Sequence, residues 1–287
     1  MALHVEEHVV RAFDENLRLL FEQEGSRLRP YVDVKTGVTG KAASWNVFIG
    51  EAAREKVASG SRHADHTQDD LDGIVSWAVL RFWYQALPLD PQDAVKLLMD
   101  PKGKYAVAIA NTLGRQVDAM LIAAAIGSAT RGEDMGTSTA LPSAQKVAAA
   151  STGMTIAKLR AAKKILDTNE VPMDGRTIAV NADMMDDLLG TTEVTSSDFN
   201  TVKALVNGDF NTFLGFHFVR TEKIVSTGSL ATGAIAFCKA SLGLAIAEEY
   251  NRVKQRVDKH DEWEAYGRVQ FGCTRTDDKG VVQISVV

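Results

Sequence analysis

The first 25 residues have the apolar spacing of an amphipathic helix. Charged side chains fill most of the intervening positions, whereas apolar residues recur at every fourth position, at Val5, Val9, Phe13, Leu17 and Phe21. This spacing predicts one apolar stripe along a helix that ends near Gly25. A stripe at the end of a chain needs a surface to cover, and that surface belongs either to the same domain or to a neighbouring chain.

The segment 26–73 has a different pattern. Short β-prone pieces such as Trp45–Phe48 alternate with Gly, Ser and Thr. Apolar residues are too sparse here to build a core, and an irregular stretch of this length is usually a functional loop or an arm. Because a long two-stranded ribbon is marginal in water by itself, we expect this segment to lie on another surface.

A long helix is predicted further along the chain. Residues 74–87 are strongly apolar and Pro88 ends them, after which Asp90-Pro91 opens a short helix. Asp100-Pro101 opens a second helix, which Gly127 closes. At 1.5 Å per residue this helix is roughly 40 Å long, which is long for a domain of this size. Its apolar stripe includes Tyr105, Ile109, Leu113, Val117 and Met120.

Shorter elements complete an α+β pattern. Thr155 caps an amphipathic helix that reaches about residue 168, and Asn181 caps a short helix through Leu189. The basic side chains of the first of these helices are expected to form a solvated face, at Lys158, Arg160, Lys163 and Lys164. Strands are predicted at 176–180, 213–219, 234–238, 250–257, 265–274 and 281–287.

Composition narrows the class of protein. The chain has 287 residues, of which 45% are hydrophobic and 24% charged, and its net charge is −5; this is the profile of a soluble globular protein. The acidic balance argues against a protein that binds nucleic acid by neutralising phosphates, but it allows one that surrounds nucleic acid. Cys238 and Cys273 are expected to be buried thiols. No targeting segment or membrane anchor is visible.

Candidate chemistry is sparse. The densest group of possible metal ligands is His63, Asp65, His66 and Asp69, but no HExxH or CxxC spacing accompanies it. Surface or interface groups are the simpler interpretation of these residues. No phosphate loop or nucleophile motif is present. A terminal amphipathic helix, a poorly cored arm and an oversized helix together favour an assembling structural protein over an enzyme.

The order of these pieces resembles the major capsid proteins of tailed bacteriophages, which share the Hong Kong-type capsid fold. Six segments carry the resemblance and together span nearly the whole chain: Ser61–Asp65, Lys96–Pro101, Tyr105–Asp118, Ile122–Gly127, Thr195–Phe199 and Phe213–Phe216.

The resemblance implies an N-terminal arm over 1–25 and an extended β-hairpin loop over 26–73 that lies across the adjacent subunit. It implies a peripheral domain over 74–173 and 250–287, with a spine helix at 101–127, and an axial domain over 174–249. The arm and spine residues named above would pack in these elements. Contacts of the loop with the neighbouring subunit would come from Glu51, Arg54, Glu55, Arg62, His63 and Asp65.

The resemblance also implies a function without catalysis or cofactor. Copies of the chain would form pentamers and hexamers of an icosahedral shell that encloses double-stranded DNA without sequence-specific binding, and without contact to a membrane. A separate scaffolding protein, a portal and a cement protein are the expected partners, and the location is the virion after assembly in the host cytoplasm. Two alternatives stay open: an encapsulin-like compartment shell, and a cytoplasmic metal-dependent hydrolase that uses His63, Asp65 and His66.

Overall fold

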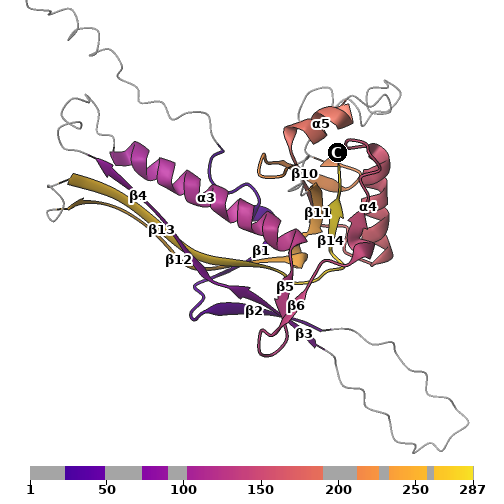
Figure 1. Ribbon diagram of the computed structural model, residues 1–287, viewed down its shortest axis with the longest axis horizontal. Coiled ribbons are helices and arrows are strands. Elements are labelled where there is room, and N and C mark those ends of the chain that lie inside the picture. The colour runs from indigo at the N-terminus through magenta and orange to yellow at the C-terminus, as the bar shows by residue number, and fades with distance from the viewer. Residues whose placement is uncertain are drawn as a thin grey trace, which may run out of the picture.

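Among the described residues, two of three β-sheets and the helices α3, α4 and α5 build two connected parts of the molecule (Figure 1). The computed structural model describes residues 23–48, 73–89, 102–189, 212–225, 233–256 and 262–286. The predicted N-terminal helix and the short helix after Asp90-Pro91 lie outside these ranges.

The first part is a long helix on a four-stranded sheet. Helix α3 spans Lys102–Ile126, close to the predicted bounds, and its 25 residues are about 38 Å long. It lies along the sheet in Figure 1. The strand order is β1 (Asp33–Thr36), β12 (Leu242–Arg256), β13 (Glu262–Arg275) and β4 (Arg81–Leu89).

The expectation that Pro88 ends the apolar segment is wrong. Pro88 lies within β4 and is paired in register with Glu264 of β13. Strand β4 is at the edge of its sheet, and an edge strand tolerates a residue that lacks a backbone N–H.

The second part is a six-stranded sheet with α4 (Ile156–Thr168) and α5 (Ala182–Leu189) beside it (Figure 1). Every residue of β8 and β11 is buried. The predicted caps are confirmed: Thr155 accepts a hydrogen bond from the Lys158 amide and Asn181 from the Met184 amide. The strand order is β7 (Lys146–Val147), β14 (Val281–Ile284), β11 (Ala234–Cys238), β8 (Arg176–Val180), β10 (Phe216–Arg220) and β9 (Thr212–Phe213).

A third sheet carries a two-stranded ribbon away from the body. Its order is β2 (Ala42–Phe48), β3 (Gly73–Val79), β5 (Ala129–Arg131) and β6 (Thr137–Thr139). The antiparallel pair β2–β3 is called the ribbon below. Single-turn 3-10 helices lie at Arg29–Tyr31, Ser143–Gln145 and Lys239–Ser241.

The described beginning of the segment 26–73 is part of the subunit's own core, contrary to the expectation that this segment has too few apolar residues for one. Leu28 and Val32 are each 2% exposed and belong to the main hydrophobic cluster. Strand β1 pairs in parallel with β12. The rest of that core comes from distant segments of the chain.

Helix α4 packs on β14 and β7 of the six-stranded sheet. Strand β12 runs without a break through residues 249 and 250.

Lys158 is not part of a solvated basic face. Its side chain is 6% exposed, and its ammonium donates hydrogen bonds to the carbonyls of Thr152, Gly153 and Ser285 at 2.7, 2.9 and 3.1 Å. Burial lowers the pKa of this amine. Lys158 therefore joins α4 to the loop before it and to the C-terminal strand.

Candidate functional site

The described residues hold no cluster typical of a metal centre. In these ranges no group of three or more His, Cys, Asp or Glu side chains could bind a metal ion. An open groove of about 300 Å³ lies between α3 and β12. The charged side chains of Arg29 and Glu249 beside it are paired with each other at 2.7 Å. Among the described helices, none is long and apolar enough to cross a membrane.

An aromatic surface covers the side of the β4–β13–β12 sheet opposite α3. Successive side chains of β13 point to opposite faces of the sheet, so Val269 and Phe271 are buried on the helix side. Tyr266 and Arg268 therefore point to the other side. We call this second side the outer face, and it includes Phe82, Tyr84, Tyr250, Arg252, Tyr266 and Arg268.

The side chains of the outer face contact one another across three strands. Arg268 lies between Tyr84 on β4 and Tyr250 on β12, and its guanidinium carbon is 5.1 Å from the centre of the Tyr250 ring. The rings of Tyr84 and Tyr266 are 6.3 Å apart. Nevertheless, Phe82 and Tyr84 are 52% and 65% exposed. Such a cluster of exposed aromatic side chains is typical of a protein–protein contact.

A buried carboxylate fixes the point where the N-terminal segment meets the subunit. Asp118 of α3 is 0% exposed. It accepts hydrogen bonds from the Ser26 hydroxyl at 2.5 Å, the Arg27 amide at 2.9 Å and the Leu28 amide at 3.1 Å. The Gln23 side chain also donates to it. We call this group the Asp118 anchor.

Close backbone contact accompanies the anchor. The Gly25 amide donates to the Asn111 side chain at 3.1 Å, and Arg115 donates to the Gln23 carbonyl at 3.2 Å. A Cβ atom on Gly114 would lie 2.5 Å from the Gly25 carbonyl carbon. A glycine at this position of α3 therefore lets the chain cross the helix in contact with its backbone.

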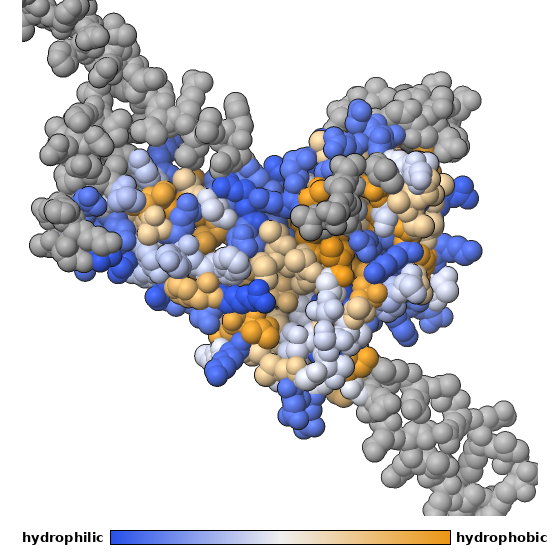
Figure 2. Space-filling model, viewed as in Figure 1, coloured by the Kyte–Doolittle hydropathy of each residue, from blue (hydrophilic) through white to orange (hydrophobic). Residues whose placement is uncertain are grey.

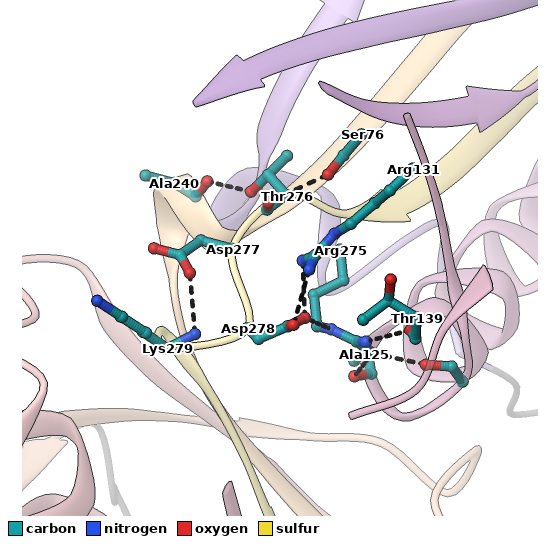
Figure 3. Close-up of polar contacts among 11 residues, drawn as sticks. Ser76, Ala125, Arg131, Thr139, Ala240, Arg275, Thr276, Asp277, Asp278 and Lys279 are labelled. Atoms are coloured by element: carbon teal, nitrogen blue, oxygen red, sulfur yellow. Dashed lines mark hydrogen bonds and ion pairs between the residues drawn. The ribbon is translucent and has the colours of Figure 1, made fainter. Parts of the chain in front are cut away.

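A second buried polar group lies where the ribbon sheet meets α3 (Figure 3). Arg275 is 0% exposed. The carboxylate of Asp278 accepts from Arg275 at 2.5 Å and from both terminal nitrogens of Arg131 at 2.8 Å. We call Arg131, Arg275 and Asp278 the junction cluster.

The spine residues named from the sequence lie on the side of α3 that faces the sheet. Ile109 and Val117 are buried, whereas Leu113 and Met120 are partly buried against the core. Tyr105 is half-buried. The named residues of the arm and of the loop lie in 1–22 and 49–72, outside the described residues.

The Asp118 anchor and the junction cluster were missed from the sequence. A signal existed for Asp118, because this acid stands between Val117 and Leu121 on the apolar side of a helix. A buried acid needs donors, but the sequence does not say that they come from residues 23–28. Arg275 carried no such signal.

Cys238 is a buried thiol, as expected, at 5% exposure, whereas Cys273 is only partly buried, against the main core. Burial, followed by the nearby Asp118 carboxylate, raises the pKa of Cys273 from 9.0 to about 12. A thiol held neutral in this way is a poor nucleophile.

Comparison with known proteins identifies the family. The family model described as "Phage capsid protein" matches residues 5–287. No curated protein sequence matches the chain.

Solved capsids share the fold. The capsid structure of the cyanophage P-SCSP1u superposes with a TM-score of 0.70 at 16% identity, covering 96% of this chain and 92% of that chain. The capsid of Ralstonia phage GP4 gives a TM-score of 0.71 at 10% identity, covering 94% and 93%. The capsid of a native GTA particle gives 0.69 at 12% identity, covering 96% and 94%.

The predicted Hong Kong-type α+β fold is confirmed by these structures. The family match also disfavours the hydrolase and compartment-shell alternatives. The chain belongs to the phage capsid protein family and is a structural protein of the phage head, a major capsid protein.

Proposed function

We propose that copies of this capsid protein close an icosahedral shell around double-stranded DNA by covering one another's outer faces. The exposed aromatic side chains of the outer face carry this proposal. Their rings are large apolar surfaces that the described part of the subunit leaves in water, and burying them against another copy releases free energy. A contact of modest strength, repeated at every subunit, gives a stable shell without any single strong bond.

The segments that would reach the neighbouring copy are the ones named from the sequence. In the loop these are Glu51, Arg54, Glu55, Arg62, His63 and Asp65, and in the arm Val9, Phe13, Leu17 and Phe21. The described structure supports this in two ways. The Asp118 anchor fixes the start of the arm, and the ribbon ends in Phe48, which is 69% exposed. Charges of both signs in the loop would select one register against wrong alternatives.

Pentamers and hexamers of the chain would form the closed surface, assembled in the host cytoplasm. The net charge of −5 suits a wall around DNA rather than a coat that condenses it. A separate scaffolding protein, a portal and a cement protein complete the proposed set of partners.

The test removes aromatic surface from the outer face without touching the core. We expect the double variant Phe82→Ser/Tyr84→Ser to fold like wild type, because both side chains are mostly exposed, but to lose shell formation. Met173→Ser is the matched control, since Met173 is 72% exposed and belongs to the turn before β8. Sedimentation velocity and negative-stain microscopy of the protein, expressed with its assembly partners, give the readout.

Shells from wild type and Met173→Ser, with unassembled subunits from the double variant, support the proposal. Normal shells from the double variant would exclude the outer face as a contact surface. Wild-type protein that stays monomeric with its assembly partners would contradict the proposed function as a whole.

A further inference from the structure

The junction cluster lies where elements from distant parts of the chain meet. Figure 3 shows Ser76 of β3, Arg131 of β5, Thr139 of β6 and the turn between β13 and β14 converging near the end of α3. Ser76 and Arg131 are opposite one another in the β3–β5 ladder. The ribbon, the spine helix and the six-stranded sheet are therefore all connected through this point.

Arg275 fixes the C-terminal end of the spine helix. Its guanidinium donates to the carbonyls of Ala125 at 3.0 Å, Gly127 at 2.6 Å and Thr139 at 3.0 Å. The last carbonyls of a helix lack partners within the helix, and the negative end of the helix dipole favours a cation. Arg275 thus holds the helix end and β6 in one fixed arrangement.

Asp278 connects this helix end to the ribbon sheet. The same carboxylate that pairs with Arg275 accepts two parallel hydrogen bonds from Arg131. Two-point pairing of a guanidinium with a carboxylate fixes orientation as well as distance. The side chains of Arg131 and Asp278 are only 11% and 15% exposed, so water screens the pair weakly.

Two further hydrogen bonds lie at this point, the first of them from the ribbon. The Ser76 hydroxyl donates to the Thr276 carbonyl at 3.2 Å, and the Thr276 hydroxyl donates to the Ala240 carbonyl at 2.6 Å. A Cβ atom on Gly272 would lie 2.5 Å from the Val79 carbonyl oxygen, so β3 crosses β13 in direct backbone contact. The junction cluster is the charged contact beside this crossing point.

A fixed direction matters because the ribbon acts as a lever. Six residues of strand are about 20 Å long, so a rotation of about 5° at their base moves their far end by about 2 Å. A displacement of this size breaks a hydrogen bond, which requires donor and acceptor within about 3.2 Å. Contacts that the ribbon makes with another copy therefore depend on the angle at its base.

We propose that Arg131, Asp278 and Arg275 set the angle between the ribbon and the spine helix and thereby the curvature of the shell. The inference rests on the proposed assembly and names the residues that position its contacts. The junction cluster does not touch the neighbouring copy in this account. It acts through the ribbon that it orients.

Arg131→Met is the decisive variant. It removes the ribbon side of the junction cluster but leaves Arg275 and Asp278 as a neutral pair, whereas loss of Asp278 would strand two guanidiniums without a counter-charge. The matched control is Arg176→Met. Arg176 of β8 is also largely enclosed, at 3% side-chain exposure against 11% for Arg131, and pairs with Asp167 at 2.6 Å, but it lies in the six-stranded sheet.

We expect folded Arg131→Met subunits to form shells whose diameters are shifted or more widely spread than those of wild type. Arg176→Met is expected to lower the urea midpoint of unfolding but to keep the wild-type diameter. Cryo-electron microscopy of the particles measures the diameters. Amide hydrogen exchange of the unassembled subunit should become faster in 73–79 for Arg131→Met and stay unchanged in 176–180.

If Arg131→Met does not fold, Arg131→Lys is tested in its place, because lysine keeps the positive charge but cannot form the two-point pairing with Asp278. Wild-type diameters from a folded Arg131 variant would overturn the inference, as would an equal shift from Arg176→Met, which would reduce the effect to general stability. These results leave the proposed function intact. Absence of shells from wild type contradicts the proposed function itself.

Discussion

The carboxylate of Asp118, in the middle of the spine helix, accepts a hydrogen bond from the hydroxyl of Ser26, 92 positions earlier in the chain. The acid is fully buried, yet its negative charge is surrounded by donors from residues 23–28. Residues 23–28 are thus held at one defined place on α3.

Asp118→Ala is expected to lower the free energy of unfolding by about 2–4 kcal/mol, because the Ser26 hydroxyl and the amides of Arg27 and Leu28 lose a charged acceptor. Urea unfolding of the unassembled subunit measures this. Asp186→Ala, at an exposed position of α5, is the control and should stay within about 0.5 kcal/mol of wild type. Equal stability of the two variants would mean that the Asp118 anchor does not hold the segment.

Helix propensity and packing predict opposite effects of Gly114→Ala on the free energy of unfolding. Alanine in the middle of a helix normally stabilises it by about 1 kcal/mol over glycine. Here the new methyl group would lie 2.5 and 2.7 Å from backbone atoms of Gly25, so we expect a net loss of about 1–3 kcal/mol.

The control for this change is Gly136→Ala, where nothing lies within 4 Å of the added methyl group. Urea unfolding should give a midpoint near that of wild type for the control and a clear decrease for Gly114→Ala. An increase for Gly114→Ala would show that residues 23–28 do not pack closely on α3.

The raised pKa of Cys273 predicts that the free energy of unfolding decreases at alkaline pH. Burial raises the pKa of the folded thiol to about 12, whereas the unfolded thiol titrates near 9.0. Between these pH values the unfolded chain has released a proton that the folded chain still holds. The contribution of this thiol to the free energy of unfolding is therefore fully present below about pH 9 and is lost as the pH rises towards 12. The slope approaches about 1.4 kcal/mol per pH unit.

Cys273→Ala should remove this part of the pH dependence. Urea unfolding of wild type and variant at about pH 8 and about pH 10.5 gives the comparison, and the difference between them at the lower pH reports only the lost packing. If the free energy of unfolding decreases by the same amount in the two proteins between the lower and the higher pH, the thiol is not the group that titrates.

Sequence reasoning recovered the elements whose signals are local. The apolar stripe and Gly127 gave the spine helix nearly to its ends, and the Thr155 and Asn181 caps gave the starts of α4 and α5. In each case the residues that decide the structure are a few positions apart. The resemblance to phage capsid proteins added the fold, which the family match and the solved capsids bear out.

The misses share a physical cause, since each depends on partners far away in the sequence. Pro88 is tolerated because β13 pairs it at a sheet edge, and Lys158 is buried because the carbonyl of Ser285 comes to it. The Arg275 contacts to Ala125 and Gly127 likewise join residues about 150 positions apart. No spacing rule within α4 or β13 contains that information.

Another copy of the chain is expected to cover the outer face in the assembled shell. A cryo-electron microscopy reconstruction of the particle shows whether it does, through the density next to Tyr84, Arg268 and Tyr250. We predict protein density from a second copy in contact with these side chains. Shells in which the three side chains face open solvent would exclude the outer face as a contact between copies.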